Sequence, residues 1–214
     1  MKIILLSGGS GKRLWPLSNG ARSKQFFKVL QDEHGNSESM MQRIYRQIRL
    51  SCPGTEVVIA AGEAQSDSIR RQIGSEAETV FEPSGRHTYP AILLSVAWLL
   101  DKRQIEDTEV IAVLPVDTYV EQGYFEKLTE MESALADSGA DVCLLGVQPT
   151  YPSEKYGYIM GESMPDRPYR QVRAYTEKPD LATARRLVSE GGRWNGGVFV
   201  FRASFVKALI EKEV

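Results

Sequence analysis

The sequence contains few of the residues that build disulfides or structural metal sites. Among its 214 residues, cysteine occurs twice and histidine twice. Cys143 lies in the apolar run "DVCLLGV", where a buried free thiol is more typical than a disulfide or a metal ligand. Because so few cysteines and histidines are present, a zinc cluster of the usual kind is excluded. The expected compartment is a reducing cytoplasm.

Long hydrophobic runs and a strong charge of one sign are also missing. The apolar run before Ser7 has four residues, which is too short for a signal peptide, and no stretch approaches the length of a membrane span. The formal net charge is −2, so any affinity for phosphate must come from local placement of cations. We therefore expect neither a membrane nor a nucleic acid as a partner.

The chain does contain an alternation of strand and helix patterns. Short apolar runs, of the kind that parallel sheets bury on both faces, occur at residues 3–6, 57–61, 79–81, 110–114 and 142–147. Helical patterns lie between them: one over 41–48 with a cap at Ser37, a well-buried one over 88–103, and one over 121–138. This succession predicts an α/β fold with a doubly wound, mostly parallel sheet.

The pattern changes after residue 148. A turn-rich stretch leads to "YGYIMG" and "YRQVRAYTE", which read as antiparallel or mixed strands, then to the helix pattern "DLATARRLVSEGG" and the strand pattern "GGVFVF". We expect these elements to extend the same sheet, so that residues 1–214 form a single domain. Because the last helix pattern reaches Val214 without a closing cap or glycine, we expect that domain to be truncated at its C-terminus.

A glycine-rich, basic segment follows the first strand pattern. In an open α/β sheet, ligands bind beyond the carboxyl ends of the strands, and glycine there lets backbone N–H groups approach a phosphate. The segment brings three glycines and two cations to this position: Gly8, Gly9, Gly11, Arg13 and Lys24. Two common phosphate-loop motifs are absent, since Leu14 stands where the dinucleotide fingerprint counted from Gly9 needs glycine, and no G-x-x-x-x-G-K-S/T motif occurs. The glycines alone would fit a plain turn equally well.

Several ordered motifs nevertheless resemble the sugar-1-phosphate nucleotidyltransferases, and more narrowly the mannose-1-phosphate guanylyltransferases. The segment "LSGGSGKRLWPLSNGARSKQF" is similar to that family's G-G-x-G-T-R-L signature with its later P-K, and the other matching motifs follow it through nearly the whole chain. They are "EPSGRHTYPAI" (82–92), "LPVD" (114–117), "EKYGYI" (154–159), "YTEKPD" (175–180) and "WNGGVFVF" (194–201).

The sequence departs from the family pattern at several positions near the expected site. Residues that differ from the usual family residue are Lys12, Asn19, Ser23, His87, Tyr89, Thr118 and Gly196. The family also uses a second metal-binding aspartate, which would lie past residue 214. These departures leave the preference for sugar and nucleotide open.

The resemblance implies a Rossmann-like, GT-A-like fold and a specific reaction. A sugar-1-phosphate oxygen attacks the α-phosphorus of GTP and expels pyrophosphate, with Mg²⁺ as the cofactor. With mannose-1-phosphate the product is GDP-mannose. The attacking phosphate is largely dianionic at neutral pH, because its second pKa is about 6, so no general base is needed. The implied partners are GTP and mannose-1-phosphate, and the resemblance leaves a homodimer open.

The resemblance assigns three catalytic roles. Arg13 would hold the β- and γ-phosphates, Lys24 would contact the α-phosphate, and Asp117 would bind Mg²⁺ through its carboxylate. Each residue has a simpler alternative: a surface arginine, a solvated lysine, and a turn or helix-capping aspartate.

Further residues are assigned to the two substrates. Residues 1–148 would bind the nucleotide and 149–214 the sugar phosphate. The nucleotide-binding set is Leu6, Gly8, Gly9, Gly11, Gly85 and Arg86, and the sugar-phosphate-binding set is Gly157, Glu177, Lys178 and Asn195. Trp194 is expected to pack rather than to stack on a ligand. A turn at Gly157 and a solvated Glu177–Lys178 pair are the structural alternatives.

Two other functions stay open. One is the same chemistry on another sugar or nucleotide. The other is a regulatory protein that binds a nucleotide sugar without turning it over, although such a protein would not need Arg13, Lys24 and Asp117 together.

Overall fold

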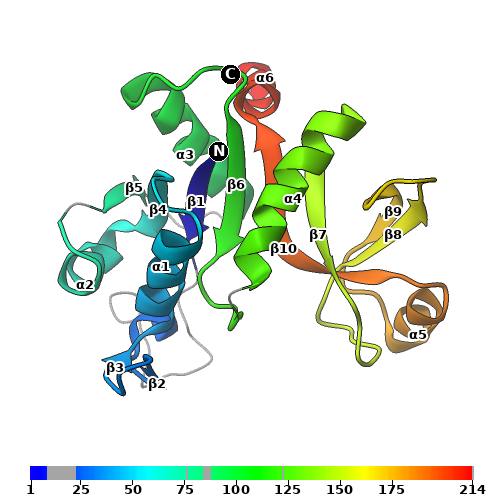
Figure 1. The fold of residues 1–214 in the computed structure, drawn as a ribbon, viewed down its shortest axis with the longest axis horizontal. Coiled ribbons are helices and arrows are strands. Elements are labelled where there is room, and N and C mark those ends of the chain that lie inside the picture. Colours follow the sequence, from blue (N-terminus) through cyan, green and yellow to red (C-terminus); the bar gives the residue numbers. More distant parts are fainter. Residues whose placement is uncertain (9–22, 76, 84–87, 122, 214) are drawn as a thin grey trace.

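The computed structural model describes the chain except residues 9–22, 76, 84–87, 122 and 214. Its central feature is one large mixed sheet with helices on both faces (Figure 1). In chain order the elements are β1 (Lys2–Leu6), the 3₁₀ helix η2 (Lys24–Phe26), β2 (Leu30–Gln31), β3 (Ser37–Glu38), α1 (Met40–Ser51), β4 (Val57–Gly62), the 3₁₀ helix η3 (Glu63–Gln65), α2 (Ser66–Gln72), β5 (Glu78–Glu82), α3 (Thr88–Lys102), β6 (Val110–Pro115), α4 (Gly123–Ser138), β7 (Val142–Val147), β8 (Tyr158–Ser163), β9 (Arg170–Thr176), α5 (Leu181–Ser189), β10 (Arg193–Arg202) and α6 (Ala203–Glu213).

The sheet is parallel in its first half and antiparallel in its second. Its order is β5-β4-β1-β6-β10-β8-β9, with β7 also paired to β10. Strands β4, β1 and β6 run parallel, with Ile4 opposite both Val58 and Val113. Strand β10 is antiparallel to β6, β7 and β8. The expectation of a doubly wound α/β sheet with a mixed-strand extension is therefore confirmed.

Strand β7 differs from its prediction. The apolar run at 142–147 was expected to be covered on both faces, but no residue of β7 is fully buried and its last two are exposed. Its pairing with β10 is antiparallel. An apolar run of six residues does not distinguish a parallel from an antiparallel strand, so the error lies in the direction and the burial, not in the strand itself.

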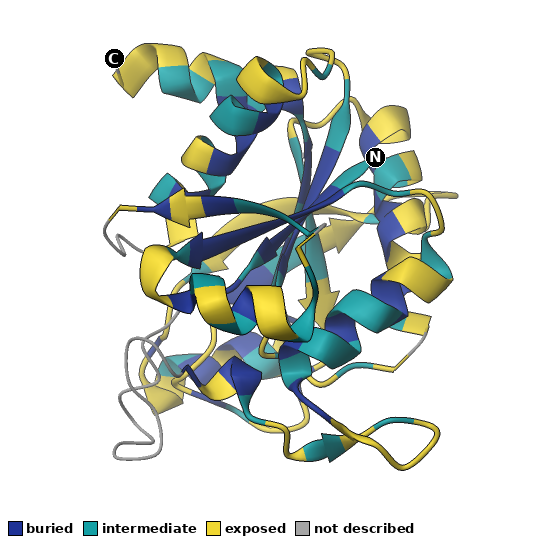
Figure 2. Cartoon of the chain, turned by 90° about the vertical axis from the view of Figure 1, so that its left-hand side faces the viewer, coloured by how far each residue is buried: buried dark blue, intermediate teal, exposed yellow. Residues whose placement is uncertain are grey.

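The parallel strands are buried because two helical layers cover them. Along β1, Ile3 and Leu5 face one layer and Ile4 faces the other, as the period of two requires. The first layer contains α1 and α4, and the second contains α3 and α6. Figure 2 shows buried strands at the centre of the molecule, with many exposed residues on the outer sides of the helices. The burial on both faces explains the nearly unbroken apolar runs.

The cap of helix α1 lies two residues later than predicted. Ser39 is the N-cap: its hydroxyl accepts a hydrogen bond from the Gln42 backbone N–H, and the Gln42 side chain accepts one from the Ser39 N–H, both at 3.2 Å. This reciprocal pair is a capping box. The prediction of Ser37 is wrong, because Ser37 lies in β3 and pairs with Gln31 of β2.

The antiparallel half is held by its own small core. Tyr158 of β8 is fully buried and packs with Ala184 and Leu187 of α5. Asp180 caps α5 by accepting a hydrogen bond from the Thr183 N–H at 2.7 Å. This cap fixes the start of α5 directly after the "TEKP" stretch. In the described ranges of the chain, no helix has both the length and the apolar character that crossing a membrane requires.

Candidate functional site

Lys24 and Asp117 meet at the carboxyl ends of β1 and β6. The Lys24 Nζ lies 2.7 Å from Asp117 Oδ2, although the two residues are 93 positions apart in the sequence. Both side chains are a little under half exposed. Asp117 follows β6 by two residues, and Lys24 begins η2. The structure therefore brings these two predicted site residues together at one edge of the sheet.

A buried hydrogen-bond network lies below this ion pair. Gln25 is 1% exposed, and its amide donates to the Ser7 carbonyl at 2.8 Å and to the Ser7 hydroxyl at 3.1 Å. The Ser7 hydroxyl donates to Gln65 Oε1 at 3.0 Å, and the Gln65 amide donates to Ser23 Oγ at 2.9 Å. Buried polar groups are costly to leave unpaired, so this network fixes the backbone on both sides of Lys24.

The network explains the placement of Lys24 better than the ion pair does. An exposed pair stabilises a protein by about 0–1 kcal/mol, which is too little to fix a loop. Sequence reasoning had singled out the lysine of "KQF" and missed Gln25 and Gln65. The only available signal was the glutamine beside Lys24, because Gln65, which joins the network through Ser7 and Ser23, lies 40 residues after Gln25 in the chain.

Leu6 ends β1, and Gly8 follows it by two residues. Leu6 is half-buried, and its carbonyl accepts a hydrogen bond from the Val116 N–H at 3.3 Å. Gly8 is exposed, and no atom of the described residues lies within 4 Å of the position that its Cβ would take. The other residues predicted to bind the nucleotide or its phosphates lie outside the described residues: Gly9, Gly11, Arg13, Gly85 and Arg86.

A second polar cluster lies on the antiparallel half. Gly157 is buried, and its carbonyl accepts a hydrogen bond from the Asn195 N–H at 2.8 Å. A Cβ at Gly157 would lie 2.6 Å from Glu177 Oε2, and it would also overlap the Tyr175 hydroxyl. A side chain at position 157 would therefore displace the Tyr175 ring and the Glu177 carboxylate. The predicted residues Gly157, Glu177 and Asn195 are neighbours in the structure.

Tyr175 joins this cluster, although sequence reasoning did not select it. Its hydroxyl donates to the Glu177 carboxylate and accepts a hydrogen bond from the Asn195 amide at 3.3 Å. Asn195 Oδ1 accepts from the Gly197 N–H at 3.0 Å. The one signal in the sequence was the spacing, because residues two apart at the end of a strand lie on the same side of the chain.

Hydrogen bonds from Lys178 and Tyr175 favour the ionised form of Glu177. Lys178, whose Nζ lies 2.8 Å from Glu177 Oε1, and Tyr175 hold the pKa of the Glu177 carboxyl below its ordinary value of 4.5. Partial burial raises the pKa of Tyr175, and its hydrogen bond to Glu177 raises it further. At neutral pH the cluster therefore presents an anion, a cation and a neutral phenol.

Lys178 also turns the chain. Its φ of +42° lies in the left-handed region, which costs a non-glycine residue about 1–2 kcal/mol. The turn stands between Glu177 and the cap of α5 at Asp180. The turn lets the Glu177 carboxylate contact the Tyr175 hydroxyl while α5 packs against Tyr158 of β8.

Trp194 packs as expected. Its ring contacts the rings of Tyr151 and Tyr156, with centroids 5.1 and 4.7 Å away. It also lies against the small core around Tyr158 and α5. These contacts occupy the indole, so Trp194 supports the cluster from the side.

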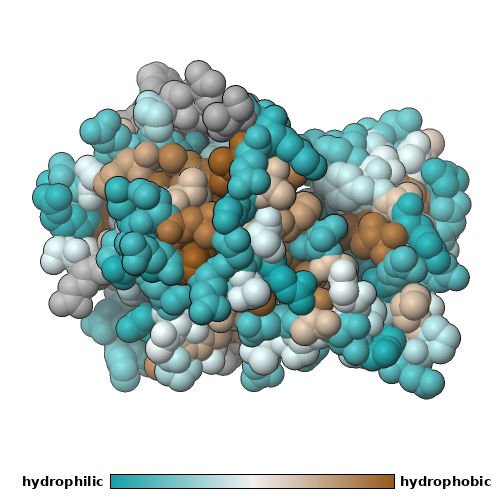
Figure 3. Space-filling view, turned by 90° about the horizontal axis from the view of Figure 1, so that it is seen from above, coloured by the Kyte–Doolittle hydropathy of each residue, from teal (hydrophilic) through white to brown (hydrophobic). Residues whose placement is uncertain are grey.

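Hydrophobicity does not single out the site. Seen from above, hydrophobic patches lie between hydrophilic side chains (Figure 3). The exposed large apolar side chains come from different elements and loops, and examples are Val29, Leu50, Leu94 and Val172. Exposed apolar residues of this kind are normal in folded proteins. The polar groups therefore define the site.

Asp117 offers a carboxylate that could hold a metal ion at the carboxyl ends of β1 and β6, called here the nucleotide edge. No group of three or more histidine, cysteine, aspartate or glutamate side chains that could hold a metal occurs among them. Asp117 nevertheless accepts a cation already, the Lys24 ammonium, and its exposed carboxylate oxygen is the ligand type that Mg²⁺ prefers. The donor set fits an ion that takes its remaining ligands from phosphate oxygens and water.

An open α/β sheet with a lysine–aspartate pair at the carboxyl ends of its parallel strands has the layout of nucleotide-binding α/β proteins. The family model described as nucleotidyl transferase matches residues 2–214. The chain therefore belongs to the nucleotidyl transferase family.

Individual relatives agree with this family. A putative mannose-1-phosphate guanylyltransferase of Vibrio cholerae is 31% identical over 94% of this chain and 43% of its own length. The xanthan biosynthesis protein XanB of Xanthomonas campestris is 34% identical over 94% of this chain and 42% of its own length. The chain thus spans less than half the length of these curated relatives.

A solved structure shares the fold. The crystal structure described as mannose-1-phosphate geranyltransferase from Thermus thermophilus matches with a TM-score of 0.83 and 30% identity. The match covers 99% of this chain and 60% of that protein. Both halves of the sheet are therefore included in the shared fold.

Proposed function

We propose that the chain carries the nucleotidyl-transfer site of a mannose-1-phosphate guanylyltransferase. In this reaction a phosphate oxygen of mannose-1-phosphate attacks the α-phosphorus of GTP, and the bond from that phosphorus to the β-phosphate breaks. The products are GDP-mannose and pyrophosphate, and no proton has to be removed from the attacking dianion. The observation that carries the proposal is the Lys24–Asp117 pair at 2.7 Å on the carboxyl edge of the parallel strands.

Lys24 and Arg13 would neutralise the phosphates on the nucleotide side. The Gln25 network holds the backbone beside Lys24 at the edge of the sheet, and from there the Lys24 ammonium would contact the α-phosphate as charge develops. Arg13 would hold the departing β- and γ-phosphates. Leu6 and Gly8 would border the nucleotide together with Gly9, Gly11, Gly85 and Arg86.

Asp117 would hold Mg²⁺. When bound, this ion supplies positive charge that offsets the repulsion between the two phosphates. Phosphate oxygens would complete its ligands. On the sugar side, Glu177 and Asn195 would bind hydroxyls, Lys178 would pair with the sugar's phosphate, and Gly157 would let the ligand approach the backbone.

Sequence relatives support a biosynthetic role. One relative is named for guanylyl transfer and another for xanthan biosynthesis. We therefore place the product among precursors of polysaccharide synthesis. A cytoplasmic location and a homodimer stay predictions.

The direct test measures pyrophosphate release. The chain is incubated with GTP, mannose-1-phosphate and Mg²⁺, and pyrophosphate is detected after hydrolysis to phosphate. Parallel incubations replace GTP by ATP, UTP or CTP and mannose-1-phosphate by glucose-1-phosphate. We expect release to require both substrates and to be fastest with the guanine–mannose pair. Fastest release with another pair would keep the chemistry and change the substrates.

A regulatory protein that binds nucleotide sugars is the second candidate. It is favoured by the observation that the described residues supply no cluster of carboxylates for a metal. Binding of GDP-mannose without pyrophosphate release from any substrate pair would support this candidate and contradict the proposed reaction.

A further inference from the structure

The hydroxyl of Tyr175 stands at the centre of the sugar-side cluster. It donates a hydrogen bond to Glu177 and accepts one from the Asn195 amide at 3.3 Å. Glu177 comes from the segment after β9, and Asn195 comes from β10. A single oxygen atom therefore connects the two side chains proposed to bind sugar hydroxyls.

The hydroxyl lies close to Gly157, and its partner Asn195 is held in place. The backbone of Gly157 lies so close that a Cβ there would overlap the Tyr175 hydroxyl. Asn195 is held from two sides, because its Oδ1 accepts from the Gly197 N–H at 3.0 Å and its backbone N–H donates to the Gly157 carbonyl at 2.8 Å. The orientation of the Asn195 amide is thus set, with its nitrogen toward Tyr175.

The remaining hydrogen-bonding capacity suits a sugar. An asparagine amide nitrogen has two N–H donors, and Tyr175 accepts one of them, which leaves a second donor. Each carboxylate oxygen of Glu177 accepts more than one hydrogen bond, so the carboxylate can still accept from hydroxyls. Tyr175 is 46% exposed and the Glu177 side chain 52% exposed, so a ligand can reach both.

We propose that Tyr175 is a positioning residue for sugar binding, whose hydroxyl orients the Glu177 carboxylate and the Asn195 amide toward a polyhydroxylated ligand. This inference rests on the proposed function, because it deepens the role of the same sugar-side cluster. It predicts that removal of one oxygen atom weakens sugar binding and leaves nucleotide binding unchanged.

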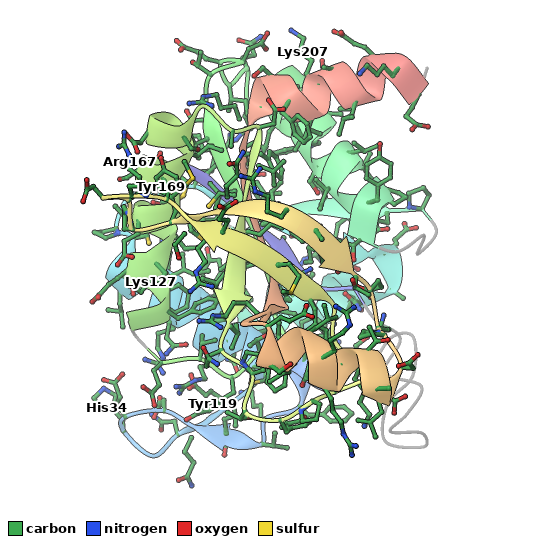
Figure 4. The ribbon with its side chains drawn as sticks, turned by 90° about the vertical axis from the view of Figure 1, so that its right-hand side faces the viewer. His34, Tyr119, Lys127, Arg167, Tyr169 and Lys207 are labelled. Atoms are coloured by element: carbon green, nitrogen blue, oxygen red, sulfur yellow. The ribbon has the colours of Figure 1, made fainter. Side chains whose placement is uncertain are left out.

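The chain supplies a matched control in Tyr169. Tyr169 is half-buried and, like Tyr175, hydrogen-bonded to a carboxylate, since its hydroxyl donates to Asp137 Oδ2 at 2.7 Å. Figure 4 shows it beside Arg167, at the other end of the β8–β9 hairpin from α5. It lies six residues before Tyr175, which corresponds to about 20 Å along a strand.

The experiment compares GDP-mannose with GDP. Both ligands are titrated into the unchanged chain, Tyr175→Phe and Tyr169→Phe by calorimetry. The ratio of the dissociation constant for GDP to that for GDP-mannose isolates the contribution of the sugar. We expect Tyr175→Phe to lower this ratio about tenfold, as the loss of a hydrogen bond to a charged group does, while the constant for GDP stays within about twofold. Tyr169→Phe should change neither value.

A double variant tests whether Tyr175 acts through Glu177. If it does, Tyr175→Phe should lower the ratio by no more than about twofold in a Glu177→Ala background, because the partner is already missing. A merely structural role of the ring would give the same loss in both backgrounds. Independent, additive losses would overturn the inference.

The outcomes separate this inference from the proposed function. An unchanged ratio in Tyr175→Phe, or an equal loss in Tyr169→Phe, overturns the role of Tyr175 and leaves the proposed function in place. If the unchanged chain binds GDP-mannose no more tightly than GDP, the proposed sugar site is wrong, and the inference about Tyr175 falls with it.

Discussion

The two polar clusters of the molecule are held in place by different means. At the nucleotide edge, exposed Lys24 and Asp117 rest on the buried amides of Gln25 and Gln65. On the sugar side, the residues of β9 are exposed except for one half-buried position, and the cluster around Tyr175 is held by hydrogen bonds near the surface.

This difference follows from the sheet. The parallel strands are covered on both faces, so a loop at their end can be tied to buried groups. The β8–β9 hairpin lies at the edge of the sheet, and α5 is the helix that packs against β8. Substitutions at the nucleotide edge should therefore change both the stability of the fold and the rate of the reaction. Substitutions on the sugar side should mainly change the affinity for the ligand.

Asp117→Asn should have the largest effect. The amide keeps the shape of the side chain and removes the charge that pairs with Lys24 and would hold Mg²⁺. We expect turnover to fall about 100-fold or more, with the affinity for GDP-mannose in the absence of metal changed by less than about threefold.

The control is Asp141→Asn. Asp141 is exposed and comes directly before β7, at the end of the sheet opposite to the carboxyl ends of the parallel strands. Near-parental pyrophosphate release by Asp117→Asn would show that the carboxylate has no part in the reaction.

Gln25→Leu tests the buried support of the nucleotide edge. The substitution removes the amide that donates to the Ser7 carbonyl, and we expect the free energy of unfolding to fall by about 2 kcal/mol. Chemical denaturation measures this change. Gln104→Leu on the surface is the control, since Gln104 is exposed. An equally stable Gln25→Leu variant would mean that the network does not fix the loop.

Gly157→Ala tests the crowding on the sugar side. A methyl group would collide with Tyr175 and Glu177, so we expect the affinity for GDP-mannose to fall about tenfold and the affinity for GDP to stay unchanged. In Gly123→Ala the methyl group meets no described atom within 4 Å, which makes it the matched control. Equal GDP-mannose binding by both variants would contradict the close packing described for Gly157.

The smallest effect is expected from pH. The folded-state pKa of the Glu177 carboxyl lies below 4.5, so this group stays ionised from about pH 5 to pH 8. Its contribution to sugar binding should be constant in that range and should be lost as the pH falls through the depressed value. Calorimetry with GDP-mannose at several pH values measures this. A decline that begins near pH 6 would show that another group controls binding.

The sequence predicted the parts of the fold that depend on local pattern. The buried parallel strands and the helices α1, α3 and α4 follow from the spacing of apolar residues. The antiparallel strands β8 and β9 were predicted from the turn-rich stretch that precedes them and from their strand-like patterns. The cap at Ser37 was wrong because two serines stand two residues apart, and only Ser39 is followed by a glutamine at the third helical position, Gln42.

The candidate site was predicted through motifs and only in part. Lys24, Asp117, Glu177 and Asn195 came from the family resemblance, and the structure places them in two clusters. Gln65 and Tyr175 were missed. Their roles depend on contacts with residues 42 and 20 positions away, Ser23 and Asn195, and no local pattern encodes such contacts.

The most direct test of the account measures pyrophosphate release by Lys24→Ala and Glu177→Ala over a range of mannose-1-phosphate concentrations, with Lys28→Ala as the control for an exposed lysine nearby. If the two clusters serve one reaction, Lys24→Ala lowers kcat about 100-fold and Glu177→Ala mainly raises the KM for mannose-1-phosphate. The same kinetic change in both variants, or none in either, would contradict the division of the site into a nucleotide edge and a sugar side.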